Sequence, residues 1–384
     1  MQIAIITENF LPKLDGVTRT LARLLEYLQS HGHKALLCGP ESGMEEYAGA
    51  KIVGTAGVPL PFYPELRFNF FRPLFLRRLN EFQPDIVHLV DPVVLGTAGL
   101  AVARMLGKPL VSSYHTNLAA YCEYFGFSLL SQPMWSYNRF IHNQCALTFC
   151  PSPSTARMLR SQGFRRVRIW PRGVDTGLFR PERRNEATRA AWLHGEEKVI
   201  LLYVGRISRE KNLRLLVQAY RGMDHTRCHL VMVGDGPALS EVKQELAHVP
   251  ATFTGYLQGE ELARAYASAD LFAFPSKTET FGQVVLEAMA AGLPVVALWA
   301  EGVCDLVENN RTGCLLESDG LTEAAQVAEY RRLLTRLVED RELRRAMGMD
   351  AHQMASARSW DQAMSHLLQG YAEALEPERP LIAA

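Results

Sequence analysis

Two glutamates and a glycine stand together in the segment PSKTETFGQVVLEAMAAGLPVV, residues 275–296. Glu279 and Glu287 are separated by seven residues, and Gly282 lies between them. A helical rise of about 1.5 Å per residue would place the two carboxylates roughly 12 Å apart, too far to share a proton or a metal ion. Acids at that spacing suit hydroxyl groups at the two ends of one elongated ligand.

The residues around Gly282 predict a strand, a loop and a helix, in that order. LFAFPS (271–276) is a buried apolar run, KTET is a polar loop, and FGQVVLEAMAA (281–291) is a helix that ends before Gly292. A helix start presents N–H groups and a positive dipole end, and a glycine there lets a phosphate approach. Acids on both sides of a phosphate site match the shape of a nucleotide-sugar, although two solvated helix glutamates would give the same spacing.

Two cations stand at the corresponding place after an earlier apolar run. VGRISREKN (204–212) puts Arg206 and Lys211 on the loop that leaves the predicted strand VILLYVG (199–205). Two cations at the carboxyl end of a strand can neutralise a diphosphate and stabilise it as a leaving group, in place of a metal ion. Exposed cations are often merely solvated, so their position opposite Gly282 is what favours this function.

Three common motifs are absent from the sequence. No Asp-x-Asp occurs, so the usual carboxylate clamp for a metal–diphosphate complex is missing and we expect no metal cofactor. The absence of GxxxxGK[ST] argues against a P-loop NTPase. VGDGP (233–237) is not GxGxxG, so a dinucleotide dehydrogenase would lack its fingerprint.

The first half of the chain offers two further candidates. Gly16 precedes a predicted helix in TENFLPKLDGVTRT (7–20), where N–H groups can bind a phosphate. His115 ends the predicted strand PLVSSYH (109–115), where an imidazole can hydrogen-bond a sugar hydroxyl or a phosphate. A histidine at a strand end and a glycine at a helix start also have purely structural explanations.

Short apolar runs alternate with helix-length amphipathic segments, a pattern typical of buried parallel strands. A polar stretch, 180–198, separates two series of such runs, and 384 residues exceed what one compact domain usually holds. We therefore expect two doubly wound α/β domains with a ligand site in the cleft between them. The predicted strands are IAIIT (3–7), KALLC (34–38), DIVHLV (85–90), PLVSSYH (109–115), ALTFCPS (146–152), VRIW (167–170), VILLYVG (199–205), CHLVMVG (228–234), ATFTGY (251–256), LFAFPS (271–276), PVVALW (294–299) and GCLLE (313–317).

The composition is that of an ordinary globular protein, with 48% hydrophobic and 21% charged residues. Lys and Arg number 41, as do Asp and Glu, so no bulk positive charge would hold a nucleic acid. The seven cysteines contain no CxxC pair, which suits reduced thiols in the cytosol. Without a signal-like start or eighteen consecutive apolar residues, the chain should stay in the cytoplasm without spanning a membrane.

Nearly the whole chain resembles a retaining GT-B glycosyltransferase of family 4. The resemblance rests on GRISREKN (205–212), VGDGP (233–237), FTGYL (253–257), YASADLFAFPSKTETFGQVVLEAMAAGLPVV (266–296) and ENNRTGCLL (308–316). It implies two Rossmann-like domains, an acceptor domain over 1–185 and a nucleotide-sugar-binding domain over 186–358. It also implies that a last helix, about 359–375, crosses back to the first domain.

The resemblance also implies roles for particular residues. Arg206 and Lys211 would bind the diphosphate and Glu287 the ribose, and His115 would lie near the reacting sugar. Gly16 matches a loop glycine that contacts the diphosphate, and Asp15 stands where many members have a second glycine. The residues implied to hold the donor sugar and phosphates are Glu279, Thr280, Phe281, Gly282 and Gln283.

Within the family, SSYHTNLAAYCEYFGF (112–127), QPMW (132–135) and FTGYLQGEELARAYAS (253–268) look most similar to sulfoquinovosyl diacylglycerol synthases and related lipid mannosyl- and glucosyltransferases. This similarity implies a glycerolipid acceptor and peripheral contact with the cytoplasmic membrane face. YPELRFNFFRPLFLRRLNEF (63–82) combines five phenylalanines with arginines, as a lipid-facing surface would. Its arginines do not share one helical face, however, and Phe75, Leu79 and Phe82 equally suit a core.

The resulting hypothesis is transfer of a hexose from a UDP- or GDP-sugar to an acceptor hydroxyl with retention of configuration. No nucleophile is evident, and the resemblance implies front-face attack in which the departing diphosphate helps to deprotonate the acceptor. Mannose, glucose and sulfoquinovose all remain open as the sugar. A soluble or polysaccharide acceptor, an inverting transferase, a sugar-nucleotide epimerase and a non-catalytic nucleotide-sugar binder are the alternatives.

Overall fold

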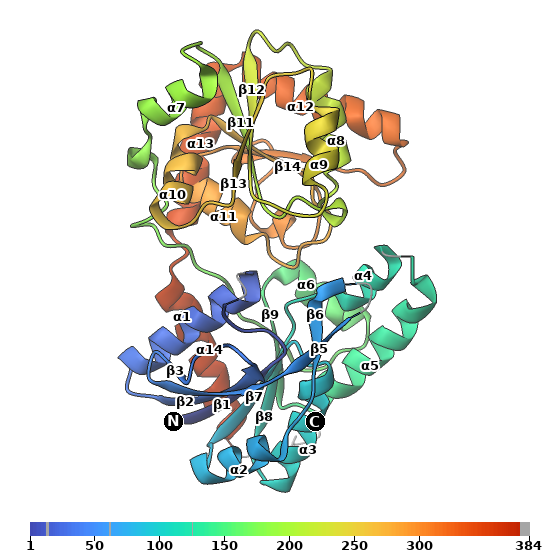
Figure 1. The fold of residues 1–384 in the computed structure, drawn as a ribbon, viewed down its shortest axis with the longest axis vertical. Helices are drawn as coiled ribbons and strands as arrows, with labels where there is room; N and C mark the ends of the chain where they lie inside the picture. The colour runs from blue at the N-terminus through green and yellow to red at the C-terminus, as the bar shows by residue number, and fades with distance from the viewer. Residues whose placement is uncertain (13–14, 61–62, 125, 377–384) are drawn as a thin grey trace, which may run out of the picture. The chain divides into compact units, whose positions relative to one another are not determined.

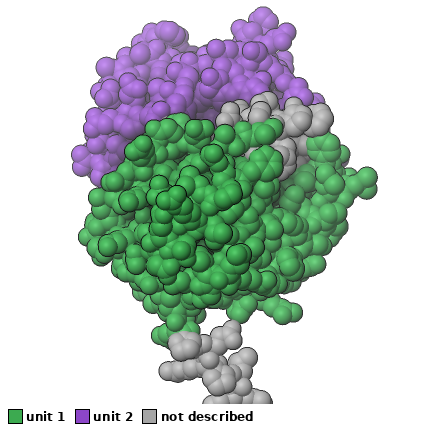
Figure 2. Space-filling model, turned by 60° about the horizontal axis from the view of Figure 1, so that its bottom comes forward, with its two compact units in different colours: residues 1–172, 360–384 green, residues 173–359 purple. Residues whose placement is uncertain are grey.

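A computed structural model describes residues 1–12, 15–60, 63–124 and 126–376 (Figure 1). The chain divides into two compact units, coloured separately in Figure 2. The first unit comprises Met1–Arg172 with the C-terminal segment that starts at Trp360, and the second comprises Gly173–Ser359. The sequence predicted the division at 185/186. The observed boundary at Arg172/Gly173 comes earlier in the chain, because Val174 and Phe179 already pack in the core of the second unit.

Among its described residues, the first unit contains an eight-stranded sheet in the order β10-β9-β8-β7-β1-β2-β4-β3. The strand pairs are parallel except for β3 with β4, and β5 and β6 form a separate antiparallel hairpin. The strands are β1 (Gln2–Thr7), β2 (Lys34–Pro40), β3 (Glu46–Tyr47), β4 (Ala50–Thr55), β5 (Gly57–Leu60), β6 (Tyr63–Asn69), β7 (Ile86–Val90), β8 (Leu110–Ser113), β9 (Leu147–Cys150) and β10 (Val167–Ile169).

Helices cover both faces of this sheet, which is why every residue of the central strands β7 and β8 is buried. Ile3 and Ile5 share one core with residues of α1 (Gly16–Ser30) and α14 (Trp360–Leu375). The alternate residues Ala4 and Ile6 share the core on the other face. That second core includes residues of α2 (Pro73–Phe82), α3 (Val94–Met105) and α5 (Ser131–Asn143).

The second unit contains a parallel sheet in the order β13-β12-β11-β14-β15-β16 within the described part of the chain. The strand order runs outward from β11 to β13 and then restarts beside β11 with β14, so a topological switch point lies between β11 and β14. Ligands of doubly wound sheets bind at the carboxyl ends of the strands at such a point. The strands are β11 (Val199–Val204), β12 (Cys228–Val233), β13 (Ala251–Gly255), β14 (Leu271–Phe274), β15 (Val295–Leu298) and β16 (Gly313–Leu316).

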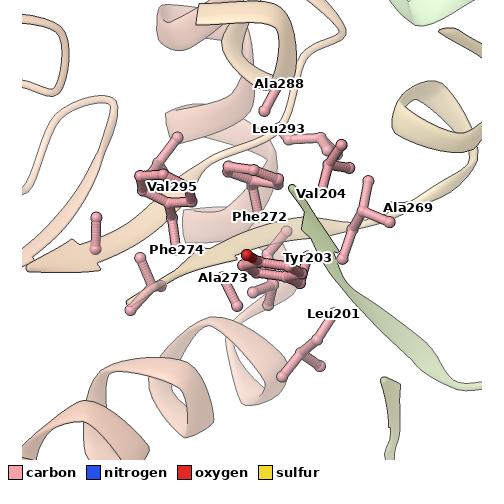
Figure 3. Packing of buried hydrophobic residues seen from close by; sticks show 14 of the residues in the cluster. Leu201, Tyr203, Val204, Ala269, Phe272, Ala273, Phe274, Ala288, Leu293 and Val295 are labelled. Atoms are coloured by element: carbon pink, nitrogen blue, oxygen red, sulfur yellow. The ribbon is translucent and has the colours of Figure 1, made fainter. Parts of the chain in front are cut away.

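Aromatic side chains fill the core of the second unit around this point (Figure 3). Leu201 and Tyr203 point to one face of the sheet, while Phe272 and Phe274 point to the other, towards Ala288 of α11 (Gln283–Ala290). The two phenylalanine rings stack with their centroids 5.7 Å apart. Burial of each such ring stabilises the unit by about 1.5–3 kcal/mol, so the strand ends beneath the site are firmly held.

The structure confirms the expected α/β fold class with two doubly wound parallel sheets, and each predicted apolar run forms a strand. In the 63–82 stretch, Phe75 and Leu79 are fully buried in α2, so these residues belong to the core rather than to a lipid-facing surface. No helix of the described residues is both long and apolar enough to cross a membrane.

Candidate active site

The loops that follow β11 and β14 are joined by hydrogen bonds at the switch point. The side-chain amide of Asn212 donates to the carbonyl of Pro275 (3.1 Å), and the hydroxyl of Thr278 donates to the carbonyl of Glu210 (3.2 Å). β11 and β14 are neighbours in the sheet, so both loops leave it at the same edge. The two loops therefore bring Lys211 and Glu279, a predicted cation and a predicted acid, to one place.

Lys211 and Glu279 form an ion pair in which the ammonium nitrogen lies 2.6 Å from Oε1 of the carboxylate. The same oxygen accepts a hydrogen bond from the hydroxyl of Ser276 (2.8 Å), which is fully buried. The lysine and glutamate side chains are 18% and 16% exposed, so the charges are only partly solvated. An ammonium has three N–H donors, so Lys211 can bind more than one acceptor.

The backbone of the loop that carries Arg206 is held in place by hydrogen bonds to other parts of the second unit. The hydroxyl of Tyr203 donates to the carbonyl of Arg206 (2.8 Å), and the N–H of Ile207 donates to the carbonyl of Asp235 (2.8 Å). The second contact brings VGDGP against this loop: a Cβ on Gly234 would lie 2.0 Å from the carbonyl oxygen of Gly205. The glycine is needed there because two backbones meet.

α11 begins directly after Gly282, which has a φ of 89° and caps the helix without a side chain. Most other residues would be strained at that φ, so the helix start stays open to an approaching group. Phe281 is only 7% exposed and packs in the core, which leaves its backbone as the part that can face a ligand. The side-chain amide of Gln283 donates to the carbonyl of Gly173 (3.0 Å).

Glu287 is buried inside α11, with an exposed fraction of 3%. Its Oε2 accepts a hydrogen bond from the hydroxyl of Tyr266 (3.1 Å), a fully buried residue of α10 (Gly259–Ser268). This partner differs from Lys211 and Ser276, which contact Glu279. A buried carboxylate is costly unless several donors reach it.

In the first unit, His115 lies two residues beyond the end of β8 and has a hydrogen bond at each ring nitrogen. Nη2 of Arg172 lies 2.7 Å from Nδ1, and the hydroxyl oxygen of Ser113 lies 2.8 Å from Nε2. Burial lowers the pKa of His115 well below its usual value, and the charge of Arg172 lowers it further. The imidazole is therefore neutral at physiological pH.

Asp91 anchors the backbone on which His115 sits. Its Oδ1 accepts from the N–H groups of His115 (2.7 Å) and Thr116 (3.0 Å), and its Oδ2 accepts from the hydroxyl of Thr116 (2.6 Å). Burial raises the pKa of Asp91 to about 6, although these three hydrogen bonds oppose that shift. The carboxyl group thus changes charge near neutral pH.

Gly16 is the first residue of α1, and the side chain of Asp15 caps this helix through the N–H of Thr18 (2.9 Å). A Cβ added at Gly16 would meet no heavy atom within 4 Å, and the φ of this glycine lies outside the left-handed range. Neither conformation nor packing among the described residues therefore requires glycine at this position. The carboxylate of Asp15 also places a negative charge at the helix start, where the N–H groups were expected to meet a phosphate.

Sequence reasoning missed four residues of these two sites: Ser276, Tyr266, Asp91 and Arg172. Ser276 and Asp91 carried a usable signal, because each is a polar residue within two positions of a predicted strand end. Tyr266 had no such signal, since its hydroxyl reaches Glu287 only through the packing of α10 against α11. Within the described residues, no group of three or more His, Cys, Asp and Glu side chains is arranged to hold a metal ion.

Comparison with known proteins follows the division into two units. Residues 14–178 match the model for Glycosyltransferase Family 4, and residues 184–354 match the model for Glycosyl transferases group 1. The GDP-mannose-dependent alpha-mannosyltransferase of Mycolicibacterium smegmatis is 37% identical over 100% of both chains. The chain belongs to glycosyltransferase family 4.

Other relatives of this family 4 glycosyltransferase agree with that assignment. The sulfoquinovosyl transferase of Arabidopsis thaliana is 35% identical over 92% of this chain and 70% of its own length. The alpha-monoglucosyldiacylglycerol synthase of Streptococcus pneumoniae is 28% identical over 82% of this chain and 75% of its own. The protein is a hexosyltransferase that uses a nucleotide-sugar donor.

Solved structures identify the fold as GT-B. HepE from Anabaena in complex with UDP-glucose has a TM-score of 0.78 at 19% identity and covers 97% of this chain and 100% of its own. Sucrose-phosphate synthase from Thermosynechococcus elongatus has a TM-score of 0.76 at 20% identity, with 97% and 98% covered. The expected GT-B fold of a family 4 glycosyltransferase is thereby confirmed.

Proposed function

We propose that this enzyme transfers a hexose, with retention of configuration, from a GDP- or UDP-linked donor to a hydroxyl of a glycerolipid. GDP-mannose is the first donor to test, because full-length relatives from three bacteria carry GDP-mannose-dependent alpha-mannosyltransferase in their names. The lipid acceptor is supported by the diacylglycerol named in another relative.

The ion pair between Lys211 and Glu279 carries this proposal. It stands at the switch point of the sheet, where Arg206 lies on the same loop as Lys211 and Gly282 on the same loop as Glu279. The two cations and the open start of α11 would hold the diphosphate and stabilise the negative charge that grows on it as it departs. Glu279 would orient Lys211 and accept hydrogen bonds from the sugar.

The remaining contacts follow from the distribution of groups around α11. Glu287 lies inside α11 with its carboxylate fixed by the hydroxyl of Tyr266, and it would accept hydrogen bonds from the ribose hydroxyls. Thr280, Gln283 and the backbone N–H groups at Phe281 and Gly282 would meet the sugar and the phosphates. None of these contacts requires a metal ion, so we propose a metal-independent reaction.

His115 and Gly16 of the first unit stay proposed donor contacts, the first for the sugar and the second for the diphosphate. Both ring nitrogens of His115 are hydrogen-bonded within the unit, so a sugar hydroxyl would share the Nε2 proton with Ser113 and leave both bonds in place. No heavy atom of the described residues lies within 4 Å of a Cβ built at Gly16, which leaves the room that a close ligand contact needs.

The chemical step is front-face attack by the acceptor hydroxyl. The bond from the anomeric carbon to the diphosphate oxygen breaks, and the bond from that carbon to the acceptor oxygen forms on the same face. The hydroxyl proton passes to the departing diphosphate. Lys211 and Arg206 act by binding this leaving group more strongly as its charge increases.

An exposed apolar segment of the first unit supports a lipid acceptor. η1 (Ser128–Leu130) and the residue before it present Phe127, Leu129 and Leu130, which are 47%, 91% and 53% exposed. Clustered apolar exposure of this kind is uncommon on monomeric proteins and marks contact surfaces. We propose that this segment contacts the cytoplasmic face of a membrane.

The decisive experiment is a donor panel with the purified enzyme and diacylglycerol vesicles, in the presence of EDTA. We expect one α-donor to give an α-linked glycolipid, identified by the anomeric coupling constants in the NMR spectrum. Lys211→Ala should lower kcat by about 10²–10³-fold while the circular dichroism spectrum stays unchanged. Unaltered turnover in the folded variant would refute the proposed site, and a β-linked product would refute retention.

A further inference from the structure

A chain of buried hydrogen bonds connects Arg172 to Tyr371 through the core of the first unit. Arg172 Nη2 lies 2.7 Å from His115 Nδ1, and His115 Nε2 lies 2.8 Å from the hydroxyl oxygen of Ser113. The same hydroxyl lies 2.8 Å from Nε2 of His88, and His88 Nδ1 lies 2.7 Å from the hydroxyl of Tyr371 on α14. All five side chains are at most 8% exposed.

The donors and acceptors of this chain can be assigned in one direction. A guanidinium only donates, so His115 Nδ1 must accept and the ring proton must be on Nε2. That N–H then donates to the oxygen of Ser113, whose own proton goes to Nε2 of His88. His88 must therefore carry its proton on Nδ1 and donate it to the oxygen of Tyr371.

The surroundings keep both imidazoles neutral, which this assignment requires. The ring of His88 lies 5.6–6.1 Å from those of Phe149, Trp170 and Tyr371, and burial lowers its pKa to about 3. The guanidinium of Arg172 stands 4.5 Å from the centre of the Trp170 ring, and its Nη1 donates to the carbonyl of Trp170 (2.8 Å). Arg172 is thus held through Nη1 as well as through Nη2, the nitrogen that contacts His115.

We propose that Arg172 and Tyr371 are positioning residues for His115, which hold its ring in one orientation with the proton on Nε2. Arg172 acts directly, and Tyr371 acts through His88 and Ser113. This inference rests on the proposed role of His115 at the donor sugar. The hydroxyl of Tyr371 is the last group in this series of hydrogen bonds. Through it, α14, the C-terminal helix among the described residues, contributes to the geometry of the site.

The variant Tyr371→Phe tests this series of hydrogen bonds with the smallest change, since it removes one oxygen and keeps the ring that packs in the core. His88 would lose the acceptor for its Nδ1 proton, and a buried N–H without a partner is unfavourable. We expect its proton to move to Nε2, so that Ser113 faces two donors and its bond to His115 weakens. Nitrogen-15 NMR of histidine-labelled protein reports the tautomer of each of the 11 histidines.

In that experiment His88 should change from the Nδ1–H to the Nε2–H tautomer, and the Nε2 resonance of His115 should shift although Tyr371 does not contact it. His88→Asn and His115→Asn assign the two signals. Tyr330→Phe is the matched control, because Tyr330 is also fully buried, lies in the second unit and donates to the carbonyl of Val296 (3.0 Å). Unchanged signals of His88 and His115 in Tyr371→Phe would overturn the chain.

Kinetics separate this inference from the proposed function. We expect Tyr371→Phe to lower kcat about 3- to 10-fold with the donor KM changed less than twofold, as loss of one orienting hydrogen bond should. Full activity of His115→Asn would refute the role of His115 itself, whatever the NMR result. A changed tautomer with unchanged kcat in Tyr371→Phe, in an enzyme that does need His115, would refute the positioning role alone.

Discussion

The ammonium of Lys211 and the carboxylate of Glu279 lie 2.6 Å apart although 68 positions separate them in the chain. The pairing exists because β11 and β14 are adjacent at the point where the strand order reverses. The topology therefore places a cation and an acid where doubly wound sheets bind their ligands. Each residue also restricts the rotamers of the other, so the pair is oriented before a donor arrives.

The first prediction is that this pair is energetically coupled. Lys211→Met and Glu279→Gln should each destabilise the second unit, because each leaves a partly buried group without its partner. The double variant should recover about 1–2 kcal/mol relative to the sum of the single changes. Hydrogen exchange of peptides from β11 and β14 measures the stability of this unit.

Arg209 and Glu241 provide the control for this coupling. Arg209 is on the same loop as Lys211 and pairs with Glu241 of α9 (Leu239–Glu245) at 3.1 Å, but the two side chains are 78% and 51% exposed. A double-mutant cycle on this exposed pair should give less than about 0.5 kcal/mol, because water screens it. Equal coupling in the two pairs would show that partial burial of Lys211 and Glu279 has no effect.

The second prediction contrasts two glycines at helix starts. Gly16→Ala should leave the stability of the first unit unchanged or raise it by up to about 1 kcal/mol, because the φ of Gly16 is ordinary and the described residues leave room for a methyl group. It should nevertheless raise the donor KM, since the new methyl group would meet the diphosphate. Gly282→Ala should cost roughly 1–2 kcal/mol on account of its φ of 89°. A Gly16→Ala enzyme with wild-type KM contradicts the proposed phosphate contact.

Much of this architecture was predictable because the strands carry a local signal. Continuous apolar runs such as VILLYVG mark strands covered on both faces, and glycines such as Gly282 mark the helix starts beside them. β4 and the hairpin β5–β6 were not predicted. β4 has mixed polarity, and the hairpin strands contain Pro59 and Pro64, so neither has the pattern of a buried parallel strand.

The partners within the site were not predictable, because they depend on contacts between distant elements. The sequence indicated Lys211 and Glu279 as separate ligand contacts and gave no sign that they pair. It placed His115 near a strand end, but its ring is fixed by Arg172, 57 positions further along. Only the three-dimensional arrangement of β8, β10 and the segment after them brings these groups together.

The third prediction concerns Glu287 as the ribose contact. Glu287→Gln should weaken competitive inhibition by GDP or UDP about tenfold or more, because a carboxylate accepts from two hydroxyls more strongly than an amide does. Inhibition by inorganic pyrophosphate, which has no ribose, should not change. Lys211→Ala should weaken inhibition by both compounds. Equal loss of pyrophosphate and nucleotide binding in Glu287→Gln would assign this residue to the phosphates or to folding instead.

The fourth prediction is a pH dependence of the first unit that Asp91 causes. Its pKa of about 6 in the folded state lies above the usual value of 3.8, so the folded unit binds the proton more tightly than the unfolded chain does. The contribution to stability is present below pH 3.8 and is lost as the pH rises towards 6, on the order of 3 kcal/mol in all. Asp91→Asn removes this titration.

The stability of Asp91→Asn relative to the wild type should therefore increase between about pH 4 and pH 6 and then stay constant. Hydrogen exchange of peptides from β7 and β8, corrected for the intrinsic pH dependence of exchange, measures this difference. Thr116→Val is a useful companion, because it removes one hydrogen bond to Oδ2 and leaves the charge of Asp91 in place. A constant difference across this range would mean that Asp91 is ionised throughout.

The fifth prediction tests the apolar segment at η1 as a membrane contact. Leu129 is 91% exposed, so Leu129→Asp should hardly affect folding, while Leu130→Asp beside it would extend the polar change. The double variant removes two apolar side chains from the proposed membrane contact and adds two negative charges. It should therefore bind vesicles of anionic lipids at least tenfold more weakly, as measured by flotation. Met349→Asp in the second unit is the matched control, since Met349 is 68% exposed and outside the segment.

The double variant should also lose activity on vesicles while it retains activity on a short-chain, detergent-soluble acceptor, because the segment holds the enzyme at the membrane and leaves the donor site intact. Equal vesicle binding by the double variant and the control would place the membrane contact elsewhere on the molecule.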